Sequence, residues 1–148
     1  MWRYGIMASQ LKVDTLTGVT TAGSIDVTGE GNSTTTNLQQ GLAKAWIRFN
    51  GSGTIAVIDS FNIASITDNG TGDYTNTFTN AMINNDYLFG GFSTGTSDGD
   101  YARIFTPRVN GSDIDASTTA YRGRSHQSWT GTAEDNPIVS SLTHGDLA

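Results

Sequence analysis

The chain has no cysteine, only two prolines and no long apolar run. The lack of cysteine excludes disulfides and cysteine-ligated zinc or iron–sulfur sites, so stability has to come from packing. No run approaches the roughly 18 apolar residues that cross a bilayer, and the N-terminal residues lack the apolar stretch of about 7 to 15 residues found in signal peptides. We therefore expect a protein without disulfides, membrane spans or an export signal.

Charge is also scarce, and most of it is negative. Charged residues make up 15% of the sequence, against about 25% in ordinary soluble domains. The net charge is −6, so the chain as a whole lacks the basic footprint that nucleic acid requires. Thr, Ser, Asn and Gly replace the missing charges, which is typical of β proteins and disfavours long helices. We expect no nucleic-acid partner.

The segment 43–74, AKAWIRFNGSGTIAVIDSFNIASITDNGTGDY, has the pattern of β-hairpins. Residues 43–49 alternate with period two, which indicates a strand. Asn50-Gly51 tolerates positive φ, as tight hairpin turns require, and a β-branched run follows at 54–58. Asn-Gly recurs at 69–70 and at 110–111. Three such turns predict an antiparallel, all-β protein.

These patterns divide the chain into an N-terminal arm, residues 1–40, and a C-terminal domain, residues 41–148. At 148 residues the chain is long enough for one domain with a sizeable core plus an arm. Short turns between strands predict that the domain is an antiparallel β-sandwich or jelly-roll-like fold. The predicted strands are 43–49, 54–66 with a bend or break near Asp59, 73–79, 87–92, 101–107, 117–125 and 136–142.

The predicted core takes the large apolar and aromatic residues of these strands. Adjacent pairs such as Trp46 and Ile47 must point to opposite faces, so one face of several strands is a candidate subunit interface. The predicted core residues are Trp46, Ile47, Phe49, Ile55, Val57, Phe61, Ile63, Ile66, Tyr74, Phe78, Tyr87, Phe89, Ile104, Phe105, Val109, Tyr121, Ile138, Val139 and Leu142.

The arm has few apolar residues between 8 and 40, and none of them is aromatic. Short strands are predicted at 10–14 and 24–28, a linker or Thr-rich strand at 32–37, and one helical turn within 38–44. Such a segment cannot offset its ordering entropy alone. Three alternatives follow for the arm: it is disordered, it packs on the following domain, or it associates with copies of itself or with another protein. For the last case, the candidate docking residues are Trp2, Tyr4, Leu11 and Val13; residues 1–6 are alternatively the product of an upstream start codon.

The segment 43–74 together with the ending HGDLA resembles the C-terminal domain of tail-fibre and other minor structural proteins of marine, cyanophage-type bacteriophages. The resemblance runs from about Gly41 to the end of the chain. It implies a homotrimer made in the host bacterial cytoplasm, located in the virion and contacting other virion proteins. It implies a short tail fibre or appendage that attaches to host-surface glycan. The alternatives are a capsid-decoration, head-fibre or connector protein with purely structural contacts, and a free carbohydrate-binding module.

Basic residues concentrate in one stretch of this acidic chain, which makes that stretch the candidate ligand site. Arginine forks bind carboxylates, and aromatic faces stack on sugar rings. The alternative is that the arginines pair with carboxylates on neighbouring strands and the aromatic residues belong to the core. The exposed loop 93–99 is a further candidate for a binding tip. The candidate ligand-binding residues are Tyr101, Arg103, Arg108, Tyr121, Arg122, Arg124 and Trp129.

The Gly-rich turns with Asp68 and Asp73 and with Asp98 and Asp100 superficially resemble calcium loops. Neither has the closing Glu that a bidentate EF-hand ligand requires, and Asp in turns commonly bonds its own backbone. We therefore expect structural turns, no metal and no cofactor.

Catalytic patterns are equally weak. The sequence Gly-Ser-Gly at 51–53 suits a hairpin turn and not a nucleophile elbow. The two histidines, His126 and His144, lack metal-ligand spacing, although three copies of His126 around a trimer axis remain an alternative. We expect no enzymatic activity.

Overall fold

The computed structural model describes residues 11–18, 25–28, 35–95, 103–111 and 113–148. The chain divides into two compact units, Met1–Leu38 and Gln39–Ala148. In the first unit, β1 (Asp26–Thr28) pairs antiparallel with β2 (Thr35–Asn37), which confirms strands near both predicted places. Residues 11–14 form no strand, so the strand predicted at 10–14 is wrong over its described part. Helix α1 (Leu38–Gly41) supplies the predicted helical turn.

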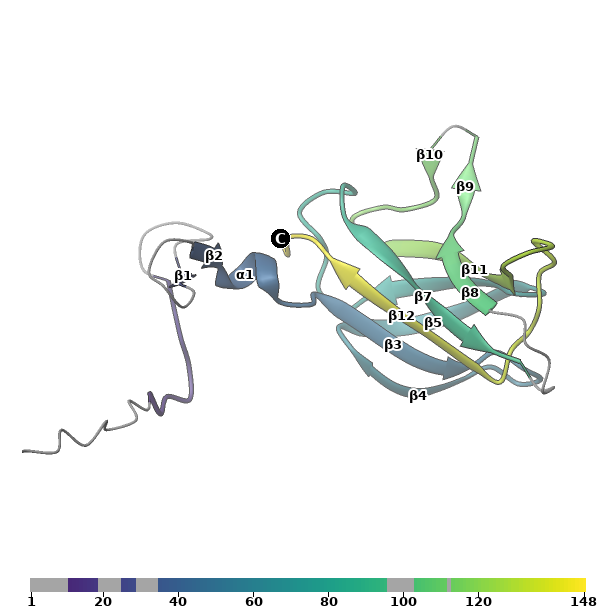
Figure 1. Cartoon of the computed structure of the whole chain (residues 1–148), viewed down its shortest axis with the longest axis horizontal. Helices are drawn as coiled ribbons and strands as arrows, with labels where there is room; N and C mark the ends of the chain where they lie inside the picture. Colours follow the sequence, from purple (N-terminus) through teal and green to yellow (C-terminus); the bar gives the residue numbers. More distant parts are fainter. Residues whose placement is uncertain (1–10, 19–24, 29–34, 96–102, 112) are drawn as a thin grey trace, which may run out of the picture. The chain divides into compact units, whose positions relative to one another are not determined.

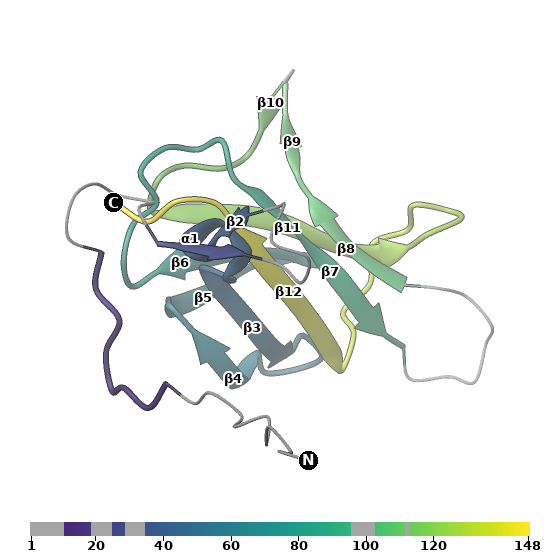
Figure 2. The ribbon, with the colours of Figure 1, turned by 60° about the vertical axis from the view of Figure 1, so that its left-hand side comes forward.

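Eight antiparallel strands of the second unit form one sheet in the order β4-β3-β12-β7-β8-β11-β6-β5, which confirms the all-β prediction. A further two-stranded ribbon, β9 (Val109–Asn110) and β10 (Asp113–Ile114), projects from this sheet in both ribbon views (Figures 1 and 2). No helix in the described part of the chain is long and apolar enough to cross a membrane. The sheet strands are β3 (Ala45–Asn50), β4 (Ala56–Phe61), β5 (Ile63–Gly70), β6 (Asp73–Phe78), β7 (Leu88–Thr94), β8 (Arg103–Pro107), β11 (Ala120–Gln127) and β12 (Ile138–His144).

The sheet curls until it is nearly closed, because its two edge strands, β4 and β5, follow one another in the chain. The corner between them is Asn62, with φ of 56°. Its side-chain amide donates to the carbonyls of Lys44 (3.0 Å) and Asn80 (3.1 Å), and its Oδ1 accepts from the Asn80 N–H at 2.7 Å. These bonds fix a break that the sequence placed near Asp59. In Figure 2, β3, β4, β12 and β7 pass in front of β5 and β6.

The hairpins exist, but two of their turns use other residues than predicted. Between β3 and β4, Gly53 and not Gly51 has positive φ, at 66°, and Asn50 Oδ1 instead accepts the Ser52 N–H at 3.0 Å. Between β5 and β6 the two-residue turn is Thr71-Gly72, with Gly72 at φ 65°. In the β9–β10 hairpin, Asn110 ends β9 and pairs with Asp113, so of the predicted dipeptide only Gly111 lies in the turn, with φ of 70°.

The core fills the inside of the curled sheet with interlocking aromatic rings. Phe49 meets Tyr74 edge-on at 4.9 Å between ring centroids, and Phe89 lies 4.4 Å from Tyr121. Such pairs contribute about 0.5 to 1.5 kcal/mol each beyond simple burial. Met82 is fully buried here although the sequence did not select it. The predicted core residues that are instead exposed are Val57, Phe61, Val109 and Leu142, and Trp46 is only half-buried.

Candidate functional site

Two of the predicted ligand-binding arginines are occupied by one carboxylate. Asp73, at the start of β6, accepts hydrogen bonds from Arg122 Nε at 2.7 Å and Arg122 Nη2 at 3.0 Å, and Arg108 Nη1 donates to its second oxygen. Asp115 lies 3.6 Å from Arg122 Nη1. The hydrogen bond to Asp73 raises the pKa of Arg122 above its already high value. Arg122 therefore holds β6 against β11, the alternative given above for these arginines.

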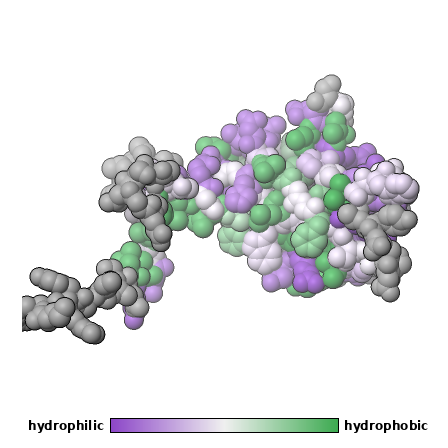
Figure 3. All heavy atoms as spheres, viewed as in Figure 1, coloured by the Kyte–Doolittle hydropathy of each residue, from purple (hydrophilic) through white to green (hydrophobic). Residues whose placement is uncertain are grey.

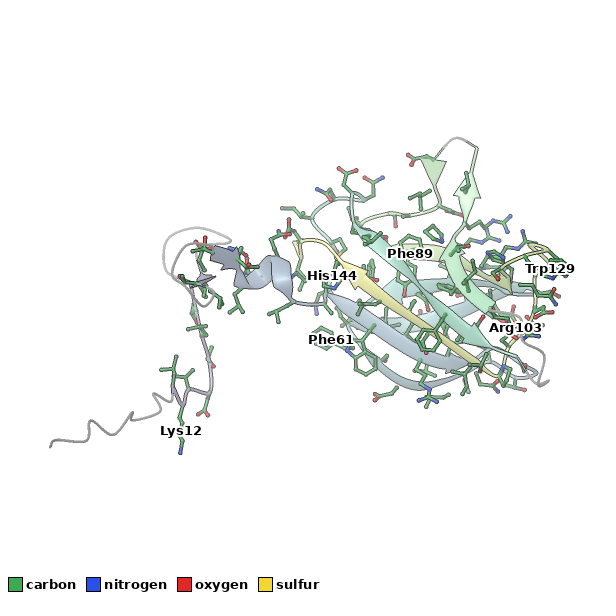
Figure 4. All side chains as sticks on the ribbon, in the orientation of Figure 1. Lys12, Phe61, Phe89, Arg103, Trp129 and His144 are labelled. Atoms are coloured by element: carbon green, nitrogen blue, oxygen red, sulfur yellow. The ribbon has the colours of Figure 1, made fainter. Side chains whose placement is uncertain are left out.

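Arg103 is engaged in the same way at another place. Its Nε donates to Glu134 Oε2 at 2.7 Å, and Gln127 donates to the other carboxylate oxygen. The hydrogen bond from Arg103 holds the pKa of Glu134 below its usual range. In Figure 4, Arg103 and Trp129 lie at the same end of the domain, opposite to Phe61 and His144. Arg103 thus ties the start of β8 to the loop before β12.

The aromatic members of the predicted site do not form a platform with these arginines. Tyr121 is a core residue, 1% exposed, with its hydroxyl 2.6 Å from Ser141 Oγ, and burial raises its pKa to about 12. Trp129 is 72% exposed. Tyr101 lies outside the described residues. Of the predicted cluster, Arg124 is exposed without a carboxylate partner among the described residues, and it lines one hollow together with the Asp73-bound Arg108.

The acidic turns behave as backbone-bonding elements where the structure describes them. Asp68 Oδ1 accepts the Gly70 N–H at 2.9 Å, as expected of Asp in a turn. Asp73 is the arginine-bound carboxylate described above. Asp98 and Asp100 lie outside the described residues. Among the described side chains, no three His, Asp or Glu residues gather as a metal site would require.

The outer face of the sheet carries an aromatic surface that the sequence assigned largely to the core. In an antiparallel sheet, residues paired across strands point to the same face. One outer row runs Phe61, Trp46, Leu142 and Gly90 across β4, β3, β12 and β7. The next row runs Asp59, Arg48, Ser140 and Phe92 across the same strands. The small residues Gly90 and Ser140 thus lie beside the bulky side chains of Leu142 and Phe92.

This difference in side-chain size hollows out a groove on the outer face. We call it the outer groove; its volume is about 820 Å³. Apolar and weakly polar residues cover much of the middle of the domain's near face in Figure 3, where these strands lie. Phe92 is 58% exposed, so a large aromatic surface faces solvent. The residues whose side chains give the outer groove its chemistry are Trp46, Arg48, Ile58, Asp59, Phe92, Ser140 and Leu142.

The outer groove combines apolar and hydrogen-bonding groups. Trp46 and Phe92 supply aromatic surface, while Arg48 and Asp59 stand opposite each other in register and supply five N–H donors and a carboxylate acceptor. Ser140 adds a hydroxyl between Arg48 and Phe92. Concave sites of this composition suit ligands with both apolar faces and hydroxyl groups. The signal for this site was present in the sequence as the alternation over 43–49, which separates Trp46 and Arg48 from Ile47 and Phe49.

The candidate docking residues of the arm have no common place in the structure. Leu11 and Val13 are exposed, at 79% and 55%, and lie outside any strand. Trp2 and Tyr4 lie outside the described residues. Docking of the arm therefore stays a prediction.

Comparison of this chain with protein-family models, with curated proteins and with solved structures finds no match. The class of protein that the fold itself defines is an all-β protein with one nearly closed antiparallel sheet. The chemistry of the outer groove is therefore the main structural guide to its function.

Proposed function

We propose that this protein is a non-enzymatic structural protein of a bacteriophage particle: a short tail fibre or appendage whose β domain attaches to host-surface glycan. The sequence resemblance of residues 41–148 supports the place in the virion. The chemistry of the outer groove supports the ligand class. The curled sheet, with core residues between its front and back strands, is compatible with the sandwich-type domain that the short turns between strands predict.

The observation that carries the glycan proposal is that one open groove is lined by two aromatic residues, Trp46 and Phe92, and by two charged residues, Arg48 and Asp59. A sugar ring has an apolar face of C–H groups that packs on an aromatic ring. Its hydroxyl groups require both donors and acceptors, which a guanidinium and a carboxylate supply at the same place. A purely apolar groove would bind a lipid or a protein segment instead.

We propose adhesion and not hydrolysis. Glycoside hydrolysis generally uses two carboxyl groups about 5 to 9.5 Å apart across the scissile bond. Among the described residues that line the outer groove, Asp59 is the one carboxylate, and Arg48 stands opposite to it. A shallow, open site with one carboxylate can hold a sugar without supplying both an acid and a second catalytic group.

Weak binding by each domain is sufficient for this function, because a trimeric appendage presents several copies. Linked sites convert a second binding event into an intramolecular one and raise overall avidity by about 10²- to 10⁴-fold. The homotrimer and the contact of the arm with other virion proteins belong to the same proposal. The arm's exposed Leu11 and Val13 are available for that contact.

The experiment is a glycan array probed with the full chain, followed by titration of the best ligand against three variants. A ring stacked on the indole removes roughly 60 Å² of apolar surface from water, worth about 1.5 kcal/mol or about tenfold in affinity. Trp46→Ala and Phe92→Ala should each weaken binding by about this factor. Trp129→Ala is the matched control, because this exposed tryptophan lies outside the outer groove. Loss of binding in the control alone would refute the groove as the site.

A second candidate is the decoration or connector protein with purely structural contacts. The observation that favours it is the exposure of Val57, Ile58 and Phe61 on the edge strand β4. An exposed edge with apolar side chains is a template for pairing with another chain. Silence of the glycan array with intact protein, together with loss of particle incorporation in Val57→Asp, would favour this candidate.

A further inference from the structure

A further open surface of the domain is the hollow that Arg108 and Arg124 line. We call it the basic hollow; its volume is about 360 Å³. It lies on the outer face, over β8 and β11 and the start of the β9–β10 ribbon. Its lining residues are Thr106, Pro107, Arg108, Val109, Arg124 and His126.

The hollow has positive charge in excess although the whole chain has a net charge of −6. Arg108, Arg122 and Arg124 share this region. Asp73 pairs with Arg108 and Arg122, and Asp115 pairs with Arg122. Both oxygens of Asp73 already accept from Arg108 and Arg122. Arg124 is exposed and pairs with no carboxylate that the structure describes, although it stands opposite Asp73 in register.

The other polar side chains of the hollow, His126 and Thr106, already make hydrogen bonds within the protein. His126 Nδ1 lies 3.0 Å from the Gln127 carbonyl oxygen, which can only accept, so Nδ1 carries the hydrogen. In the neutral imidazole, His126 Nε2 then accepts from the Thr106 hydroxyl, 2.9 Å away. This pair forms a fixed wall, and the free donors are the guanidinium of Arg124 and the remaining N–H groups of Arg108. Guanidinium forks match carboxylates and sulfates.

The basic hollow and the outer groove are connected by one row of side chains. Phe92 of the groove pairs with Ile104, and Ile104 pairs with His126 of the hollow. Two strand spacings separate Phe92 from His126, which is about 10 Å along the sheet. The outer groove thus ends on β7, and the basic hollow begins on the neighbouring strand, β8.

We propose that the basic hollow binds the carboxylate or sulfate of an acidic glycan whose neighbouring rings occupy the outer groove. Arg124 is the principal contact and Arg108 the second. This inference rests on the proposed function, because it specifies the ligand of the same surface. It also makes a selective claim: the acidic form of a glycan binds more tightly than the neutral form.

The test uses the full chain and two matched pairs of oligosaccharides: an oligogalacturonate with its methyl ester, and a sulfated carrageenan fragment with its desulfated form. Isothermal titration calorimetry at low ionic strength measures each affinity. In at least one pair the acidic form should bind about 10- to 100-fold more tightly, because a hydrogen bond between two charged groups is among the strongest. Arg124→Gln should remove most of this preference and Arg108→Gln part of it. Lys12→Gln, which removes one positive charge elsewhere, should leave it unchanged.

The outcomes separate the two proposals. If the neutral forms bind but neither pair shows a preference, or if the preference survives in Arg124→Gln, the basic hollow is not a glycan subsite and the proposed function stands. If no oligosaccharide binds the wild type, both proposals fail for these ligands. Inorganic sulfate is the last ligand to be tested. Should it raise the melting temperature of the wild type but not of Arg124→Gln while no sugar binds, the hollow is a site for free anions and the inference is wrong.

Discussion

Gly123 on β11 lies under the ring of Phe105, and its replacement by alanine tests the packing of the core. A Cβ at position 123 would lie 2.2 Å from Phe105 Cζ, 2.4 Å from Cε1 and 2.9 Å from Cε2. Ordinary contacts between such atoms are near 3.5 to 4.0 Å. Phe105 is 1% exposed and meets Phe49 edge-on at 6.4 Å, so its ring has little room to move.

The expected cost follows from these distances. Overpacking a core typically costs about 1 to 3 kcal/mol, and three ring atoms at short range place Gly123→Ala at the upper end. Alanine regains roughly 0.5 to 1 kcal/mol, because glycine loses more chain entropy on folding. The net destabilisation is therefore about 2 kcal/mol. For a domain near 100 residues this lowers the melting temperature by about 10 °C.

Chemical and thermal denaturation followed by circular dichroism measure this loss. Gly41→Ala is the matched control, since a Cβ there meets nothing within 4 Å, and its stability should stay within about 0.5 kcal/mol of the wild type. Phe105→Leu should destabilise alone but cost less in the Gly123→Ala background, because the shorter side chain relieves the clash. A Gly123→Ala protein as stable as the wild type would refute the assigned inner face of β11.

Three further predictions concern polar groups. Asp73→Asn should cost about 2 kcal/mol in urea unfolding, since it leaves Arg122 without its paired carboxylate; additive effects of Asp73→Asn and Arg122→Gln would contradict the ion pair. Arg103 lowers the pKa of Glu134 in the folded state. The stability that this ion pair adds is therefore fully present above the pKa of Glu134 in the unfolded chain, about 4.3, and is lost as the pH falls through the lower pKa of the folded state. The free-energy difference between the wild type and Glu134→Gln should therefore shrink in acid, and a difference independent of pH would refute this. Asn76 is fully buried, and its amide has no hydrogen-bond partner among the described residues, so Asn76→Leu should keep or raise the melting temperature; a large loss would show that the amide is satisfied.

The sequence predicted the strands well because period-two alternation is a local property. Residues 43–49 alternate clearly, and β3 forms there. Alternation alone does not say which face is inside when both faces are apolar. Ile47 is buried and Trp46 is half-exposed because the residues beside them on β12, Ser141 and Leu142, lie on the inner and outer faces, and that pairing is not local.

The candidate site was harder to predict for the same reason. The arginines at 103, 108, 122 and 124 are close in sequence, which suggested one site, but their partners come from elsewhere. Asp73 precedes Arg122 by 49 residues, and Glu134 follows Arg103 by 31. Only the strand order brings these groups together, so the sequence identified basic residues without showing which of them remain open.

The turns show a smaller failure of local signals. Asn69-Gly70 is a strong hairpin dipeptide, yet the chain turns two residues later at Thr71-Gly72. There the loop reaches Asp135, whose Oδ1 accepts both the Gly72 N–H at 2.7 Å and the Tyr74 hydroxyl at 2.9 Å. Burial, together with this long-range contact, raises the pKa of Tyr74. Tertiary contacts thus selected one of two possible turns.

A heteronuclear NMR titration of the full chain with the best ligand from the glycan array, read at the tryptophan indoles, tests sugar binding in the outer groove most directly. Sugar bound there should cause a saturable shift of the Trp46 indole signal and of the amide signals of Gly90 and Ser140, with little change at Trp129. Saturable binding that leaves the Trp46 indole unshifted would contradict the proposal that the outer groove holds the sugar.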